Sequence, residues 1–107
     1  MIRHVVLFRP RAGVAAEELA AVRAALEGLE VGQPGGAAEY QTFAWGADVS
    51  PEGLQRGYGA GFTIDFRDAR ARDAYLADPG HKAAGARLVA AAEGGVEGLL
   101  VLDLDLG

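Results

Sequence analysis

The stretch Asp68–His81, DARARDAYLADPGH, contains two helix starts separated by one short turn, and it decides how this chain folds. Asp68 can accept hydrogen bonds from the first free amides of one helix. Asp78 can do the same for a second helix, with Pro79 at the first helical position, where a missing N–H costs nothing. His81 then lies in the first turn of the second helix, where the helix dipole disfavours a positive charge. We therefore expect a neutral ring that can accept a proton at about pH 7.

A tyrosine accompanies this histidine. Tyr75 lies six residues before His81, near the end of the first corner helix, so the two rings can meet across the corner. Two interpretations are open. His81 is either a general base beside Tyr75, or an exposed first-turn residue next to a packed corner ring.

The segments around the corner alternate in a way that predicts strands and helices. Ile2–Arg9 is a strand with an apolar centre on both faces, as in a sheet that is covered on two sides. His4 lies on the face that carries Ile2, Val6 and Phe8. It is either a core histidine that hydrogen-bonds to a neighbour or a polar group of a site.

The remaining elements follow from the same patterns. Further strands are predicted over Ala38–Gly46, Tyr58–Phe66 and Val96–Leu106, a helix over Glu17–Leu29, loops over Gly32–Gly36 and Asp48–Gly57, and the second corner helix runs to about Glu93, before Gly94 and Gly95. Gly59 and Gly61 are unusual in a strand. They indicate a close backbone approach, a bulge, a subunit contact or local sheet curvature.

The order strand, helix, strand, strand, helices, strand predicts an α+β, ferredoxin-like βαββαβ fold. In this fold an antiparallel four-stranded sheet carries its helices on one face. A second apolar face then needs cover, and we assign to it Val5, Leu7, Phe43, Trp45, Leu99 and Val101. Two sheets packed face to face would bury that surface, so we expect an obligate homodimer with a barrel-like core.

The final strand also carries two acidic residues. Asp103 and Asp105 have the spacing of a metal site, but the same spacing is typical of a solvated strand edge. We favour the solvated edge and predict no metal ligands.

Composition excludes several classes of function. The 107 residues fit one domain, 1–107, and a net charge of −5 with scattered basic residues argues against a nucleic-acid partner. There is no cysteine, and two histidines far apart in sequence do not suit a structural zinc site. With no apolar stretch of the roughly 20 residues that span a membrane and no targeting segment, we expect a cytoplasmic protein.

Several stretches together resemble a known family. They are MIRHVVLF at the start, TFAWGADVS before the third strand, GYGAGFTIDF, DAYLADPGH at the corner and LLVLDLDL at the end. In these stretches the chain resembles the stress-responsive A/B barrel (Dabb) domains of the dimeric α/β-barrel superfamily. The resemblance covers nearly the whole chain and implies the ferredoxin-like dimer.

The same resemblance implies a possible chemistry. Polyketide cyclases of the olivetolic acid cyclase type, which belong to this family, close a linear polyketide by aldol condensation without a metal or organic cofactor. Their corner histidine is the base, and a corner tyrosine and the N-terminal strand histidine support it. The matching positions here are His81, Tyr75 and His4. One departure is Leu26, which stands where the cyclases have a pocket tyrosine. The shape of the pocket therefore differs, and the resemblance does not identify the substrate.

We accordingly expect a small apolar pocket between the sheet and the helices. Its substrate-binding side chains are predicted to be Leu26, Tyr58, Phe62 and Leu88. The alternatives are a non-catalytic dimer, either stress-responsive or binding a hydrophobic ligand, and a cofactor-free monooxygenase. No cofactor is expected for the cyclase.

Overall fold

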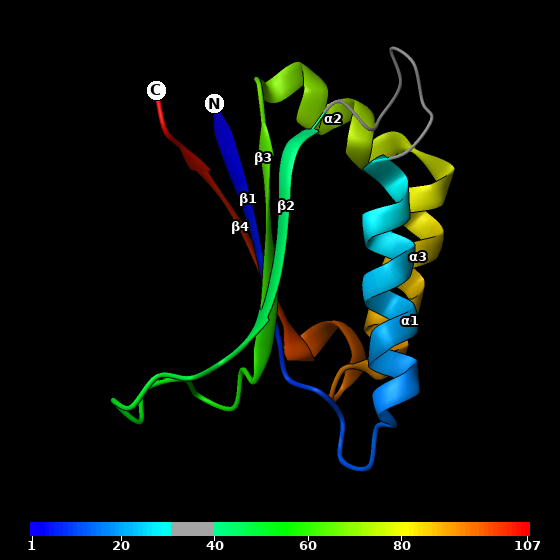
Figure 1. Cartoon of the computed structure of the whole chain (residues 1–107), viewed down its shortest axis with the longest axis vertical. Helices are drawn as coiled ribbons and strands as arrows, with labels where there is room; N and C mark the ends of the chain where they lie inside the picture. The colour runs from blue at the N-terminus through cyan, green and yellow to red at the C-terminus, as the bar shows by residue number, and fades with distance from the viewer. Residues whose placement is uncertain (31–39) are drawn as a thin grey trace.

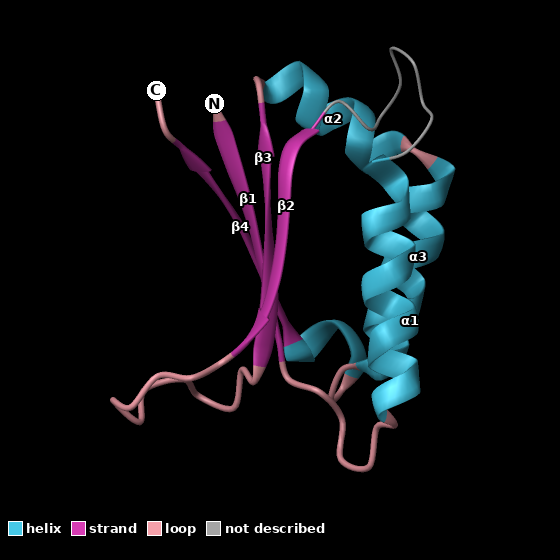
Figure 2. Cartoon of the chain, viewed as in Figure 1, coloured by secondary structure: helices cyan, strands magenta, loops and turns pink. Residues whose placement is uncertain are grey.

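The computed structural model describes residues 1–30 and 40–107 (Figure 1). The elements in chain order are β1 (Ile2–Phe8), α1 (Ala16–Glu27), η1 (Gly28–Glu30), β2 (Tyr40–Ala47), β3 (Ala60–Phe66), α2 (Ala69–Ala77), α3 (Pro79–Ala91), η2 (Gly95–Gly98) and β4 (Leu99–Asp105). Here η marks a short 3-10 helix. Figure 2 shows two layers, with the helices on one face of the strands.

The four strands form one antiparallel sheet in the order β2-β3-β1-β4. The first and last strands of the chain, β1 and β4, are therefore neighbours. Of the strands that are consecutive in sequence, β2 and β3 pair directly, while β1 and β2, and β3 and β4, are each separated by one strand. This topology, with two helical crossings on one face, is the ferredoxin-like α+β fold expected from the order of the elements.

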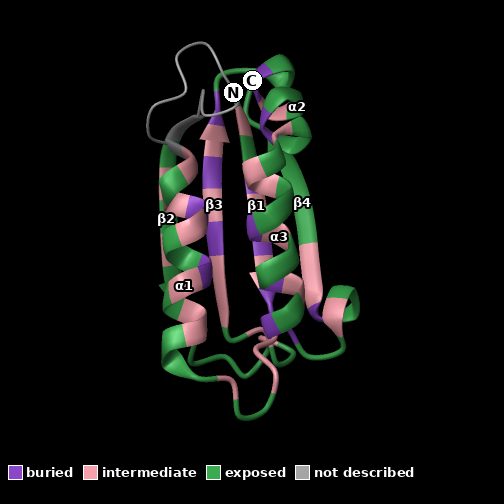
Figure 3. Ribbon diagram, turned by 90° about the vertical axis from the view of Figure 1, so that its right-hand side faces the viewer, coloured by how far each residue is buried: buried purple, intermediate pink, exposed green. Residues whose placement is uncertain are grey.

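The core lies between the sheet and the helices. α1 lies over β2 and β3, while α3 lies over β1 and beside β4, which is largely exposed (Figure 3). Alternate residues of β1 and β3 point into this layer, as the two-residue period predicts. The largest fully buried side chains of this layer are Phe8, Val22, Leu26, Ile64, Phe66 and Tyr75.

Several predicted boundaries were wrong by a few residues. α1 ends at Glu27, and α3 ends at Ala91. β3 begins at Ala60, because Tyr58 and Gly59 belong to the preceding loop. The predicted strand over 96–106 is a 3-10 turn followed by β4, because Gly94 and Gly95 have φ values of +70° and +67° and turn the chain. The predicted loop over Gly32–Gly36 lies outside the described residues, as do the first two residues of the strand predicted over Ala38–Gly46.

The assignment of the second apolar face was partly wrong. Phe43 and Trp45 lie on the helix side, where Trp45 stacks on Phe62 with ring centroids 5.7 Å apart. Leu99 and Val101 lie there too, opposite Phe8 and Val6. Strand alternation separates two sets of side chains, but only the pairing register decides which set meets the helices.

The face away from the helices is nevertheless apolar. We call it the open face. The β1–β4 register puts Val5 opposite Leu102 and Leu7 opposite Leu100 on it. Leu102 and Leu104 are 42% and 45% exposed. The segment between β2 and β3 extends away from the sheet on this same side (Figure 1).

Gly61 explains one of the strand glycines. It pairs with Leu7 on β1, and a Cβ there would lie 2.7 Å from Leu7 Cδ2 and 2.8 Å from the Val6 carbonyl oxygen. Close approach of the neighbouring strand therefore requires a glycine at this position.

Candidate functional site

A cavity of about 340 Å³ lies between α3 and the sheet, on the β1–β4 side. Its wall is mostly aliphatic, with two histidines and one lysine as the polar side chains. The lining residues are His4, Val6, Leu26, Phe62, Leu76, His81, Lys82, Gly85, Leu88, Val89, Leu99 and Val101. The volume is in the range of small-molecule sites.

His4 enters this cavity from the middle of β1. It is only 4% exposed, and its Nδ1 lies 2.7 Å from Oδ1 of Asp103 on β4. Burial of Asp103 alone would raise the pKa of its carboxyl. Hydrogen bonds from His4 and Arg72 outweigh burial and hold that pKa below its usual value. An ionised carboxylate only accepts, so Nδ1 of His4 donates and a neutral ring keeps its lone pair on Nε2.

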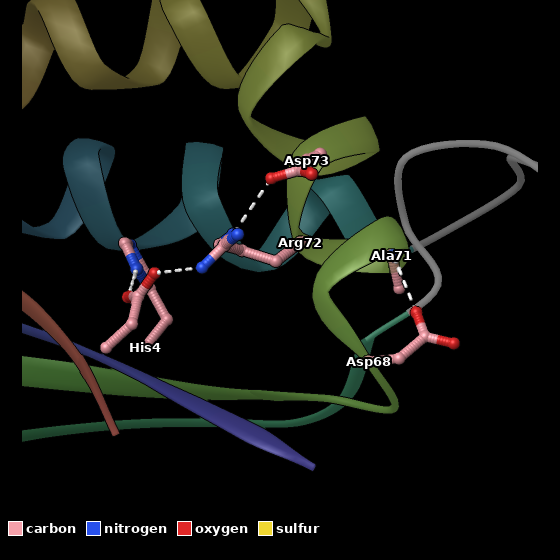
Figure 4. A network of polar contacts seen from close by, with 6 residues as sticks. His4, Asp68, Ala71, Arg72 and Asp73 are labelled. Carbon is pink, nitrogen blue, oxygen red and sulfur yellow. Dashed lines mark hydrogen bonds and ion pairs between the residues drawn. The ribbon is translucent and has the colours of Figure 1, made fainter. Parts of the chain in front are cut away.

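Asp103 is itself held by a second partner. Nη1 of Arg72 on α2 donates to Asp103 Oδ2 at 3.0 Å, and Nε of Arg72 donates to Asp73 at 3.0 Å. Figure 4 shows the guanidinium of Arg72 between Asp73 and the His4 side chain. A chain of charged groups thus fixes the orientation of the His4 ring.

His81 enters from the first turn of α3. The Asp78 side chain accepts its backbone N–H at 3.1 Å, and Pro79 takes the first helical position, as predicted. Its Nδ1 is buried and has no hydrogen-bond partner among the residues that the structure describes. Burial chiefly lowers the pKa of the ring, His4 and Lys82 lower it further, and Asp78 opposes them. The ring is therefore neutral and available as an acceptor at about pH 7.

Tyr75 lies behind both histidines. Its ring centroid is 4.3 Å from that of His81 and 6.1 Å from that of His4, so the predicted meeting of rings across the corner is confirmed. Tyr75 is 1% exposed and is not among the side chains that line the cavity. It supports the two imidazoles from the core side rather than facing the cavity.

Of the predicted substrate-binding residues, Leu26, Phe62 and Leu88 line the cavity. Tyr58 does not, and that prediction was wrong. Its ring lies 4.7 Å from the guanidinium carbon of Arg9, beside a separate hollow of about 500 Å³ lined by residues such as Ala44, Gly61 and Thr63. The strand alternation does not extend back through Gly59, so Tyr58 does not share the face of Phe62.

Sequence reasoning missed several residues of this site, among them Asp103, Lys82 and Gly85. Asp103 was assigned to a solvated strand edge, but it binds His4 and Arg72. The assignment was wrong because the register that puts Asp103 opposite His4 is not visible in the sequence. Lys82 and Gly85 were overlooked, although helical spacing from His81 puts Gly85 on the same face of α3.

Two further properties bear on the site. Within residues 1–30 and 40–107, no three His, Cys, Asp or Glu side chains come close enough together to hold a metal ion. No helix in the described part of the chain is long and apolar enough to cross a membrane.

Comparison with solved structures finds the same fold in several proteins. A dimeric ferredoxin-like protein of unknown function from Jannaschia sp. CCS1 is 32% identical, with 98% of each chain covered and a TM-score of 0.87. The protein At3g17210 of Arabidopsis thaliana is 25% identical, with 100% of this chain and 96% of that chain covered and a TM-score of 0.84. Hydroxynitrile lyase from Passiflora edulis is 18% identical over 99% of this chain and 93% of its own, with a TM-score of 0.83, and it shares the fold.

Among curated proteins, none matches this sequence significantly. The model of the stress responsive A/B barrel domain matches residues 2–105, which is nearly the whole chain. With the ferredoxin-like sheet, this match shows that the chain belongs to the stress responsive A/B barrel domain family.

Proposed function

We propose that this chain forms a homodimeric α/β-barrel enzyme that catalyses an aldol-type ring closure of a small, largely apolar polyketide-like compound. The observation that carries the proposal is the cavity itself. It is apolar over most of its wall, and it brings together His4 and His81, which are far apart in the sequence. The dimeric state of the Jannaschia relative supports the homodimer.

In the proposed step, the imidazole of His81, which lines the cavity, removes a proton from a carbon next to a carbonyl group. The resulting enolate carbon attacks a second carbonyl carbon of the same molecule and forms the new carbon–carbon bond. The alkoxide oxygen takes a proton back, and His81 returns to its neutral form. A neutral base suits this cycle, and burial lowers the pKa of His81 and keeps its ring neutral.

His4 and Tyr75 have supporting roles in this proposal. Asp103 fixes the His4 ring, so His4 offers a polar contact of defined direction to a substrate oxygen. Tyr75 orients His81, because its ring packs against the imidazole with centroids 4.3 Å apart. Leu26, Phe62 and Leu88 bind the apolar part of the substrate.

A second candidate function is binding of a hydrophobic ligand without turnover, because the same apolar wall suits it. A third, cofactor-free oxygenation of an electron-rich aromatic compound, would consume dioxygen. Product analysis and an oxygen electrode separate these three outcomes.

The test is to incubate the purified protein with a linear tetraketide thioester and to follow the cyclised product by liquid chromatography and mass spectrometry. We expect His81→Gln to lower the rate by about 10²–10⁴-fold, the usual contribution of a positioned base. Arg87→Gln, an exposed change on the same helix, is the matched control and should leave the rate unchanged. Equal rates for His81→Gln and the unsubstituted protein would remove His81 from the role of base.

A further inference from the structure

The charged side chains that line the cavity are of one sign. Among the described residues that line it, Lys82 is the only cationic side chain and there is no aspartate or glutamate. The N-terminal end of α3, a helix of 13 residues, adds its partial positive charge at the same place. Two carboxylates lie next to this wall, but both are already engaged: Asp78 accepts the His81 amide, and Asp103 accepts from His4 and Arg72.

Lys82 also makes no ion pair within the part of the chain that the structure describes. No carboxylate of residues 1–30 and 40–107 lies within ion-pair distance of its ammonium group. Arg72 shows the contrast, since Asp73 and Asp103 both bind its guanidinium. Asp78, one turn before Lys82, has its carboxylate engaged as the cap that accepts the His81 amide.

Gly85 makes room next to this lysine. It lines the cavity one turn after His81 and Lys82, and a Cβ built on it would have no atom within 4 Å. The space that it leaves is therefore continuous with the cavity rather than filled by a neighbour.

We infer that the cavity binds an amphipathic carboxylate, with its alkyl or aryl body among the aliphatic side chains and its carboxylate bound by Lys82 at the mouth beside Gly85. This inference rests on the ligand pocket of the proposed function and adds the class of its occupant. The apolar wall excludes water from the body of the ligand, and the ammonium group offers a charge-assisted hydrogen bond to its anionic end. Lys82 is then a specificity-determining residue, separate from the two histidines.

The experiment is an NMR titration of the full-length protein with phenylbutyrate and, separately, with phenylbutanamide, which has the same shape without the charge. The amide signals of His81 and Gly85 report the binding. We expect phenylbutyrate to bind about tenfold more tightly than the amide at low ionic strength, and the difference to shrink as salt screens the exposed lysine.

Two variants locate the effect. Lys82→Met keeps the apolar stem and should remove the tenfold preference while leaving phenylbutanamide binding within about twofold. Arg87→Met removes a positive charge from the same helix outside the cavity wall and should leave the preference intact. Gly85→Leu fills the space and should weaken both ligands.

The outcomes separate the two proposals. Equal affinities for the two ligands, or equal effects of Lys82→Met and Arg87→Met, would overturn the carboxylate assignment and leave the apolar pocket in place. Absence of binding by either ligand, with the His81 and Gly85 signals unmoved, would overturn both the assignment and the ligand pocket of the proposed function.

Discussion

At the scale of single residues, the pairing of His4 with Asp103 determines what the site can do. A buried imidazole that donates to an ionised carboxylate has one defined tautomer and one defined orientation. Asp105, two residues later on the same strand, accepts with its carboxylate from the Gly107 amide and from no other group in residues 1–30 and 40–107. Two aspartates on the same face of one strand therefore have different roles, because only one lies opposite a histidine.

We predict that Asp103→Asn lowers the free energy of unfolding by about 1–2 kcal/mol, since the buried His4 ring and Arg72 both lose a charged partner. Asp105→Asn is the control and should stay within about 0.5 kcal/mol of the unsubstituted protein. Urea denaturation at fixed protein concentration measures both. ¹⁵N NMR of His4 should show loss of the single tautomer only in Asp103→Asn, and an unchanged tautomer would contradict the role given to Asp103.

The second residue-scale prediction concerns pH. The pKa of His81 is lowered from 6.5 by burial, with further lowering by His4 and Lys82 against the opposing effect of Asp78. The unfolded chain therefore binds more protons at this position than the folded protein does, and stability falls as the pH drops from 6.5 through the lower folded value.

His81→Gln cannot titrate, so its free energy of unfolding should change less between about pH 7 and pH 5 than that of the unsubstituted protein. Arg87→Gln should keep the full pH dependence. Parallel curves for His81→Gln and the unsubstituted protein would show that this ring is not desolvated in the folded state.

At the scale of elements, the corner between α2 and α3 positions His81 in the wall of the cavity. Asp78 ends one helix and caps the next, so the direction of α3 depends on this one side chain. We predict that Asp78→Ala costs about 1 kcal/mol of stability and speeds hydrogen exchange in the first turn of α3. Asp78→Ser keeps a capping oxygen and should restore most of both. Equal stability of the alanine and serine variants would mean that packing alone holds the corner.

Two glycines in regular elements should respond in opposite ways to alanine. Gly85→Ala places a methyl group in open space on a helix and should stabilise the protein by about 0.5–1 kcal/mol. Gly61→Ala would press a Cβ against Leu7 and the Val6 carbonyl, and should destabilise it by about 1–3 kcal/mol. Thermal and urea unfolding measure the pair, and a shift of the same sign in both would contradict the packing described for the two sites.

At the scale of the whole molecule, we expect the open face to form the contact between two copies of this chain. Leu102 and Leu104 are more than one-third exposed on the face of the sheet that carries no helices. Large apolar side chains exposed beside one ion pair, Arg3–Asp65, are typical of a surface that another protein covers, and a second copy of the same sheet is complementary to it.

We predict that Leu102→Lys converts the dimer to a monomer, because the substitution puts a charge in the middle of the interface. Val96→Lys, at an exposed position of η2 away from the open face, is the control and should remain dimeric. Sedimentation velocity gives both masses. A dimeric Leu102→Lys protein would show that the subunits meet through another surface.

The sequence by itself determined the order of the elements, the ferredoxin-like topology, the capped corner with its neutral His81 and the contact between Tyr75 and His81. These follow from local rules, since capping, periodicity and spacing act over a few residues. Only the tertiary structure decided that Asp103 binds His4, that Phe43 and Trp45 face the helices and that Tyr58 lies outside the cavity. Strand register joins residues almost 100 positions apart, and alternation marks two faces without saying which one the helices will cover.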